Sequence, residues 1–266
     1  MVPQLAPLKL REKEGDLSER VATRLYIPGE CKVGMSVALD QAQAHRLKHV
    51  LRLGAGAAVG AFNDGAGEWL CELVELGRGR LALNPLRQIR LPEAEPDLWL
   101  LFAPLKRARL DWLVEKGSEL GAAALVPIWT ARTQPERINR DRLRAIAVAA
   151  AEQSERLSVP EIRAPERFDE ALAAWPADRR LILCDESGAG MPIADALLAL
   201  SANARAAVFV GPEGGFTDAE LDAFGKLPIV SRVGLGPRVL RAETAALAAL
   251  AVFQAIAGDW RRVRPQ

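Results

Sequence analysis

The chain after residue 97 alternates between apolar strand-like stretches and helical stretches, and this alternation constrains the fold more than any other feature. Consecutive parallel strands need crossover connections, and helices in those connections bury both faces of the sheet. We therefore predict an α/β domain with a parallel sheet over residues 98–266. Its predicted strands cover 98–104, 124–129, 180–185, 206–211 and 228–235, and its predicted helices cover 106–121, 137–157, 192–200, 217–224 and 242–258.

Two local signals predict helix ends in this domain. Thr217 and Glu220 have the spacing of a capping box, so a helix should begin directly after Thr217. Gly121 follows a helical pattern and should end that helix, because glycine readily adopts the left-handed conformation of a helix carboxyl end.

The chain before this domain has a different pattern. Residues 22–90 combine short strand-like stretches, glycine turns and one helical stretch at 42–53, which predicts a small β-rich domain. "LPEAEPD" at 91–97 is rich in proline and acidic residues and predicts a linker. Residues 1–21 are polar and weakly patterned and predict a flexible extension without a secretion signal.

Composition excludes several classes of protein. No apolar stretch approaches the roughly 20 residues of a membrane-spanning helix. Cys31, Cys71 and Cys184 are odd in number and widely spaced, which favours reduced thiols in a cytoplasmic protein over a disulfide framework or a zinc site. We therefore expect neither a membrane nor a metal as partner.

The formal net charge of +1 argues against indiscriminate polyanion binding, but arginine far outnumbers lysine. Arginine binds phosphates and stacks on bases, so this bias is compatible with RNA binding. GC-rich coding produces the same bias, and only the positions of the arginines can distinguish the two causes.

Several familiar motifs are absent or fit poorly. "LGAGAAVG" at 53–60 resembles a dinucleotide fingerprint, but its last interval is one residue too long and a strand follows it, which predicts a turn. His45 and His49 are one helical turn apart, yet the basic residues around them favour a solvated basic helix face over a metal site. No Walker A sequence and no Gly-x-Ser-x-Gly elbow is present.

Two glycine-rich loops remain, "GPEGG" at 211–215 and "GLGPRVLR" at 234–241, and each follows a predicted strand. Clustered glycines allow positive φ and a close approach of backbone to a ligand. Ligands on parallel sheets bind beyond the carboxyl ends of the strands. Two such loops therefore predict a pocket, although a purely structural turn is the alternative for either loop alone.

The sequence resembles the RsmE family of 16S rRNA (uracil-N3)-methyltransferases of the SPOUT superfamily. The resemblance rests on "VGPEGGFTDAEL" and "LGPRVLRAETA", and on "HRLKHVLRL" and "KRARLDWLVEKGSELG" in the same order and spacing. It implies a PUA-like RNA-binding β-barrel at 22–90, a SPOUT domain with a trefoil knot at 98–266, and a homodimer. It also implies S-adenosylmethionine as cofactor and 16S rRNA in the small ribosomal subunit as substrate.

The resemblance further implies the site residues. The expected cofactor contacts are Gly211, Glu213, Gly214, Leu235, Gly236, Val239 and Leu240. Uracil N3 must lose a proton before it accepts a methyl group, and Arg241 and Glu243 are the candidate catalytic residues because neither histidine lies in the predicted pocket. The alternative is that these two side chains only pair at the helix start. The candidate phosphate contacts are Arg24, Arg52, Lys106, Arg132 and Arg156.

Three other functions remain open at this point. A SPOUT enzyme that acts on a different RNA or on a ribose hydroxyl would share the knot. A non-catalytic RNA-binding assembly factor would share the fold and bind no cofactor. A nucleotide-dependent oxidoreductase fails on the fingerprint spacing at 53–60.

Overall fold

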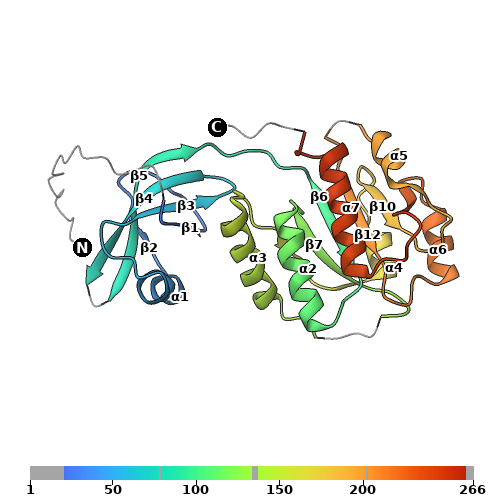
Figure 1. Ribbon diagram of the computed structural model, residues 1–266, viewed down its shortest axis with the longest axis horizontal. Helices are drawn as coiled ribbons and strands as arrows, with labels where there is room; N and C mark the ends of the chain where they lie inside the picture. Colours follow the sequence, from blue (N-terminus) through green and yellow to red (C-terminus); the bar gives the residue numbers. More distant parts are fainter. Residues whose placement is uncertain (1–20, 78, 134–136, 202, 262–266) are drawn as a thin grey trace.

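The structure is a computed structural model that describes residues 21–77, 79–133, 137–201 and 203–261. The predicted flexible extension therefore lies outside the described residues except for Val21. Two parts lie side by side, a small β-sheet domain and a larger α/β domain, and an extended segment that leads into β6 (Leu98–Phe102) joins them (Figure 1). None of the helices in the described ranges is both long and apolar enough to cross a membrane.

The amino-terminal domain is a five-stranded sheet in the order β1-β3-β4-β5-β2. The strands are β1 (Thr23–Tyr26), β2 (Val37–Ala38), β3 (Ala58–Asn63), β4 (Gly67–Gly77) and β5 (Arg80–Arg90). Only β1 and β3 pair in parallel, and the other neighbours are antiparallel. Gly56, in the fingerprint-like stretch, has φ +88° in a turn before β3, as predicted for a turn.

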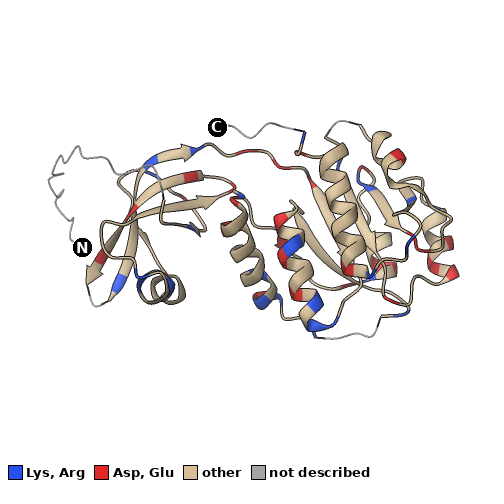
Figure 2. Ribbon diagram, in the orientation of Figure 1, with Lys and Arg blue, Asp and Glu red and all other residues tan. Residues whose placement is uncertain are grey.

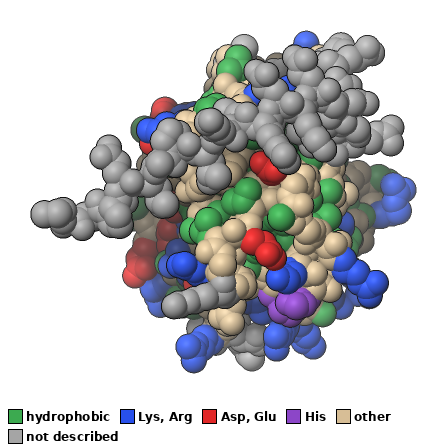
Figure 3. Space-filling view, turned by 90° about the vertical axis from the view of Figure 1, so that its left-hand side faces the viewer, with side chains coloured by type: hydrophobic (Ala, Val, Ile, Leu, Met, Phe, Trp, Pro, Cys, Tyr) green, Lys and Arg blue, Asp and Glu red, His purple; other side chains and the backbone are tan. Residues whose placement is uncertain are grey.

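The predicted helix at 42–53 has two forms. A helix, α1 (Gln41–His45), continues into a wider π-helical turn, η1 (Arg46–Val50), in which the Leu51 amide donates to the carbonyl of Arg46. Leu47 is fully buried beneath it, whereas His45 and His49 are exposed with ring centroids 4.9 Å apart. Figure 3 shows the two histidines on the surface among Lys and Arg side chains, in agreement with a solvated basic face.

The α/β domain contains a sheet in the order β11-β13-β10-β12-β6-β7-β8, and all of its pairs are parallel. After β6 its strands are β7 (Ala124–Trp129), β8 (Glu161–Ile162), β10 (Arg180–Cys184), β11 (Met191–Pro192), β12 (Ala206–Val210) and β13 (Val230–Gly234). A short strand, β9 (Glu166–Arg167), pairs with β7 outside this order. The parallel α/β domain predicted from the alternation is confirmed.

Helices cover both faces of this sheet. One face packs against α2 (Arg107–Glu119), α3 (Arg140–Ser154), α5 (Ile193–Leu198) and α7 (Ala242–Ile256). The other face packs against α4 (Phe168–Ala173) and α6 (Asp218–Gly225). The capping box of Thr217 and Glu220 is present, and Gly121 follows the α2 cap with φ +82°, so both predicted helix ends are confirmed.

The order of strands reverses around β10. The chain runs from β10 through α5 to β12 on one side of β10, and then through α6 to β13 on its other side. The carboxyl ends of three neighbouring strands and the loops that follow them therefore meet at one edge. Ligand sites in parallel α/β domains lie at such a reversal.

A buried arginine joins the two domains. Arg24 in β1 forms an ion pair with Glu68 at 2.8 Å and donates to the carbonyls of Ala151, Glu152 and Arg156 at the carboxyl end of α3, at 2.8–3.2 Å. These contacts engage all five N–H groups of the guanidinium. We therefore do not retain Arg24 as an RNA contact, because it has no donor left for a phosphate.

Arg156 is likewise structural. It is buried, it donates to the carbonyls of Ser118 and Ala122 at 2.5 and 3.0 Å, and it forms an ion pair with Glu95 of the predicted linker. A guanidinium that ties the linker to the end of α2 is not available to RNA. Its predicted phosphate contact is not retained either.

Candidate functional site

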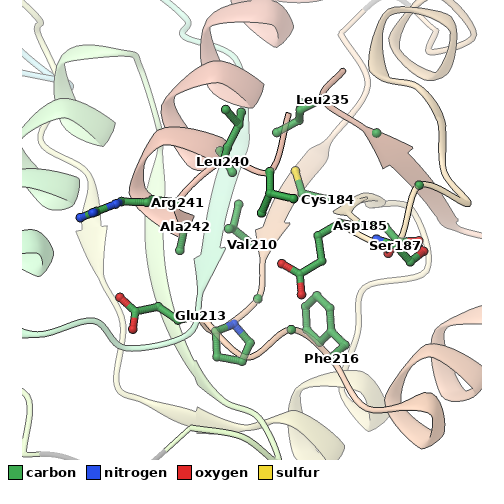
Figure 4. Close-up of a pocket in the computed structure, with 18 of the residues that line it drawn as sticks. Cys184, Asp185, Ser187, Val210, Glu213, Phe216, Leu235, Leu240, Arg241 and Ala242 are labelled. Atoms are coloured by element: carbon green, nitrogen blue, oxygen red, sulfur yellow. Dashed lines mark hydrogen bonds between the residues drawn. The ribbon is translucent and has the colours of Figure 1, made fainter. Parts of the chain in front are cut away.

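A cavity of about 800 Å³ lies where the loops after β10, β12 and β13 meet, and Figure 4 shows its lining. Both glycine-rich loops predicted to form a pocket contribute to it. The third loop, residues 185–190 after β10, is not among the predicted site segments.

The loop after β12 depends on glycine at two positions. A Cβ on Gly211 would lie 2.8 Å from the Phe216 ring, and a Cβ on Gly215, which has φ +68°, would overlap the carboxylate of Glu186. Arg132 fastens the loop by donating to the carbonyls of Gly214 and Phe216. The loop is therefore closely packed against Phe216, Glu186 and Arg132, which also line the cavity.

The loop after β13 has more open space. Gly236 has φ +99°, and nothing lies within 4 Å of where its Cβ would be. Leu235 and Leu240 pack against the core and lie close together in the cavity, whereas Val239 is 82% exposed. This loop supplies an apolar surface beside a stretch of bare backbone.

The loop after β10 is built around a buried carboxylate. Asp185 accepts hydrogen bonds from the amide and hydroxyl of Ser187, both at 2.9 Å, and from Arg232 in β13 at 2.6 Å. Burial alone would raise the pKa of Asp185, but these hydrogen bonds outweigh it and the pKa lies below its ordinary value. Asp185 thus ties this loop to β13. Its sequence signal was the "DESGAG" stretch directly after a predicted strand.

Charged residues on the α2 and α7 side form a separate group. Arg109 of α2 forms an ion pair with Glu213 and lies 3.6 Å from Glu243 in the first turn of α7. Glu243 is buried, and its Oε2 has no hydrogen-bond partner among the described residues. Arg241 does not pair with Glu243 in the described structure, so the predicted helix-start clamp is formed by Arg109 instead. In Figure 4 the charged ends of Arg241 and Glu213 point away from Cys184.

Six of the seven predicted cofactor residues line this cavity: Gly211, Glu213, Leu235, Gly236, Val239 and Leu240. Gly214 lies in the same loop but does not line the cavity, and Gly215 lines it instead. Of the predicted catalytic residues, Arg241 lines the cavity and Glu243 lies behind Arg109.

The remaining predicted RNA contacts are separated in the structure. Arg132 lines the cavity, Lys106 is exposed at the amino end of α2, and Arg52 is exposed beyond η1 with φ +56°. Cys184 also lines the cavity, and its burial raises the pKa of the thiol to about 12, so it stays protonated at neutral pH.

The cavity suits a mixed apolar and zwitterionic ligand. Its charged lining residues are Arg109, Arg132, Arg238, Arg241, Asp185, Glu186, Glu213 and Asp218, which gives as many basic as acidic groups. Leu235, Leu240 and the exposed backbone of the two glycine loops fit a flat heteroaromatic ring, whose edge peptide groups can read. A volume of about 800 Å³ is within the range of small-molecule and cofactor sites. The residues present therefore fit S-adenosylmethionine, which has an adenine ring and a charged methionine end.

Fold and site together define a class: a cofactor-binding α/β enzyme with its site at the sheet reversal, joined to a small β-sheet domain. Comparison with known proteins narrows the class. Residues 92–254 match the family described as an RNA methyltransferase domain, and residues 39–86 match the RNA methyltransferase PUA domain.

Curated relatives agree over most of the chain. Ribosomal RNA small subunit methyltransferase E of Rickettsia conorii is 30% identical over 86% of this chain and 93% of the relative. The enzyme of the same name from Synechocystis sp. is 32% identical over 96% of this chain and 84% of the relative. Methyltransferase E from Neisseria gonorrhoeae, solved bound to S-adenosyl methionine, is 28% identical with a TM-score of 0.78 over 90% of this chain and 99% of that one.

The chain belongs to the ribosomal RNA small subunit methyltransferase E family. Its fold is a PUA-like β-sheet domain followed by a parallel-sheet RNA methyltransferase domain. The family and fold class implied by the resemblance are confirmed.

Proposed function

We propose that this protein uses S-adenosylmethionine to methylate N3 of one uridine in 16S rRNA, and that its substrate is the assembled small ribosomal subunit. Family membership supports the rRNA methyltransferase activity, and the cavity at the sheet reversal is the observation that carries the cofactor site. When bound, the cofactor supplies an electrophilic methyl group.

Residues of the three loops would contact different parts of the cofactor. Leu235 and Leu240 would pack on the adenine faces, and the backbone around Gly211 and Gly236 would meet the ring edge and ribose. The charged residues of the cavity would hold the methionine end. Residues that align the methyl group with N3 lower the barrier, because an in-line displacement depends on orientation.

The N3 proton needs an acceptor on the α2 and α7 side. The Glu243 carboxylate would accept the N3 proton as N3 accepts the methyl group that the bound cofactor would supply, and the electron pair of the broken sulfur–carbon bond would stay on sulfur. Arg109 positions Glu243, and Arg241 stabilises negative charge on the uracil oxygens. The support is an unpartnered Glu243 oxygen among the described residues, next to the cavity arginines.

Further properties belong to the same proposal. α7 follows β13 on one side of β10 but packs against β12, β6 and α2 on its other side, which supports a trefoil knot around residues 185–205. Exposed Val239 and Trp112 support a homodimer interface near the cavity. Arg52, Lys106 and Arg132 remain the candidate phosphate contacts. Because bacterial ribosomes are in the cytoplasm, the proposed substrate implies that the protein acts there.

The test uses small subunits from a bacterium that lacks the modification. They are incubated with the protein and labelled S-adenosylmethionine, and the RNA is digested to nucleosides and analysed by mass spectrometry. We expect label in 3-methyluridine, at one site. Label in another nucleoside would overturn the assignment of N3, and the absence of transfer, despite cofactor binding, would favour a non-catalytic assembly factor.

A matched pair of variants tests the acid–base role. Glu243→Gln should bind S-adenosylmethionine like wild type and methylate roughly 100-fold more slowly, which is a typical loss for general-base removal. Asp222→Asn changes an exposed carboxylate of α6 that does not line the cavity and should keep near wild-type turnover. Wild-type turnover by Glu243→Gln would contradict the role.

A further inference from the structure

We propose that Tyr26, Arg46 and Arg144, at the seam between the two domains, form a second RNA-contacting surface, which we call the seam patch. It rests on the proposed function, because it contacts the same RNA whose uridine enters the cavity. None of the three residues is among the sequence-predicted RNA contacts.

Tyr26 is the only tyrosine in the chain and the last residue of β1. Its amide donates to Glu152 of α3 at 3.1 Å, and its carbonyl accepts from Gln43 of α1 at 3.1 Å. One side chain from each domain therefore fixes its backbone. The ring is half-buried and packs edge-on against Phe62, with centroids 5.9 Å apart.

Arg144 lies over this ring, and Arg46, from the other domain, is linked to Tyr26 through Glu152. Arg144 of α3 lies with its guanidinium carbon 6.0 Å from the ring centroid. Arg46 of η1 pairs with the buried Glu152, and its side chain remains 43% exposed. Within the described ranges, neither the Tyr26 hydroxyl nor Arg144 has a hydrogen-bond or ion-pair partner. The Glu152 carboxylate accepts from the Tyr26 amide and pairs with Arg46, so it does not neutralise the charge of Arg144.

An aromatic ring with one arginine over it and a second exposed arginine nearby fits single-stranded RNA. Bases stack on aromatic rings and on guanidinium planes, and arginines bind the phosphates between them. Such contacts tolerate many sequences, which suits a surface that positions RNA for a site elsewhere that selects one uridine.

Within the seam patch, Arg144 lies toward the cavity edge of the α/β domain, whereas Tyr26 and Arg46 contact Glu152 near the carboxyl end of α3. Arg144 is in the second turn of α3, and in parallel α/β domains the amino ends of helices lie at the carboxyl ends of strands. Basic residues mark the amino ends of α2 and α3 and the surface of α1 in Figure 2. Lys106, Arg107 and Arg137 there are exposed and have no acidic partner among the described residues. A strand of RNA can therefore cross from the seam to the cavity along this edge.

The test compares Arg144→Ala and Tyr26→Leu with two controls. Tyr26→Phe keeps the ring, and Arg167→Ala removes an exposed arginine beside α4, on the opposite face of the sheet. We measure the KM for small subunits, the salt dependence of subunit binding, the Kd for S-adenosylmethionine by calorimetry, and the melting temperature of each variant.

We expect Tyr26→Leu to raise the KM for subunits about tenfold, the size of a lost stacking contact. Arg144→Ala should raise it about fivefold and reduce the slope of log affinity against log salt by about one, as for one phosphate contact. Both controls should stay within about twofold of wild type, and the Kd for S-adenosylmethionine should not change in any variant.

Two results would overturn the seam patch. One is wild-type KM values in both Arg144→Ala and a folded Tyr26→Leu variant. The other is weaker binding by Arg144→Ala with an unchanged salt slope, which would indicate contact with a ribosomal protein. If wild type methylates no subunit nucleoside, the proposed function fails instead, and the binding measurements still decide whether the seam patch contacts RNA.

Discussion

Glycine is required around the cavity for different reasons at different positions. Gly236 needs a positive φ but has free space, whereas Gly215 needs a positive φ and also has the Glu186 carboxylate where a Cβ would be. Gly190 lacks a positive φ but has no room for a side chain, because a Cβ would lie 2.5 Å from the Val233 carbonyl carbon. The glycines of this site are therefore not interchangeable.

We expect Gly215→Ala to weaken S-adenosylmethionine binding more than Gly236→Ala, since only the former displaces another cavity residue. Each carries about 1–2 kcal/mol of backbone strain. The double variant Glu186→Ala/Gly215→Ala removes the overlap and should recover part of the affinity lost in Gly215→Ala. Calorimetric titration of the three variants measures this, and no recovery in the double variant would show that strain alone is responsible.

Asp185 gives the site a defined pH dependence. Its pKa in the folded protein is lower than in the unfolded chain, so its ionised form stabilises the fold at pH above about 3.9, its ordinary value, and this contribution is lost as pH falls through the folded pKa. Asp185→Asn should lower the free energy of unfolding by about 2 kcal/mol at pH 7, since hydrogen bonds to a charged group are lost.

The difference between Asp185→Asn and wild type should shrink below pH 4. Urea unfolding of both proteins at pH 7, 5 and 3.5 measures it, with Asp218→Asn as a control for an exposed carboxylate. A difference that is constant over this range would contradict the assigned role of Asp185.

Among the elements, those with a clear periodicity were predictable and those without it were not. β6, β7, β10, β12 and β13 and the helices α2, α3, α5 and α7 lie within the predicted ranges, and α6 extends one residue beyond its range, to Gly225. The two-residue strands β2, β8, β9 and β11 are too short to show any alternation. The six-residue helix α4 lies in a stretch punctuated by Pro160, Pro165 and Pro176, where we predicted no element.

In the candidate site, too, some parts could be predicted from the sequence and others could not. Its two glycine loops have a local signature and were predicted, and six of seven cofactor residues line the cavity. The loop after β10, "DESGAG" at 185–190, was not predicted as part of the site, because it joins the site only through the reversed strand order. The role of Arg109 depends on α2 lying beside α7, which no spacing in the sequence reveals.

Arg24 joins the amino-terminal domain to the end of α3, so replacing this one residue should disturb the contact between the domains. Arg24 carries contacts to Glu68 and to three carbonyls of the other domain. Arg24→Ala should cost about 3–5 kcal/mol, because it leaves Glu68 buried without its main partner. Arg24→Ala should also speed proteolytic cleavage in the linker at 91–97, because the domains lose the hydrogen bonds from Arg24 to the end of α3.

Limited proteolysis and urea unfolding test this together. Lys48→Ala breaks an exposed ion pair with Glu75 inside the amino-terminal domain and should have a much smaller effect on both. If Arg24→Ala left linker cleavage and unfolding unchanged, the contact would not hold the domains together.

At the scale of the whole molecule, the fold combines a site and a means of presenting RNA to it. The reversal of strand order around β10 gathers three loops into one cavity, and the fixed seam holds the PUA-like domain at a set distance from that cavity. A modest net charge of +1 is compatible with RNA binding, because exposed basic residues without acidic partners in the described ranges lie near the amino ends of α2 and α3, namely Lys106, Arg107 and Arg137.

The proposed function requires that the loops after β10, β12 and β13 together bind S-adenosylmethionine. A calorimetric titration of wild type and of Leu240→Asp, which places a charge against the predicted adenine surface, tests it most directly. We expect saturable binding to wild type with one molecule per chain and at least about a tenfold loss of affinity in folded Leu240→Asp, the size of a charge buried without a partner. An absence of saturable binding to folded wild-type protein would contradict the account.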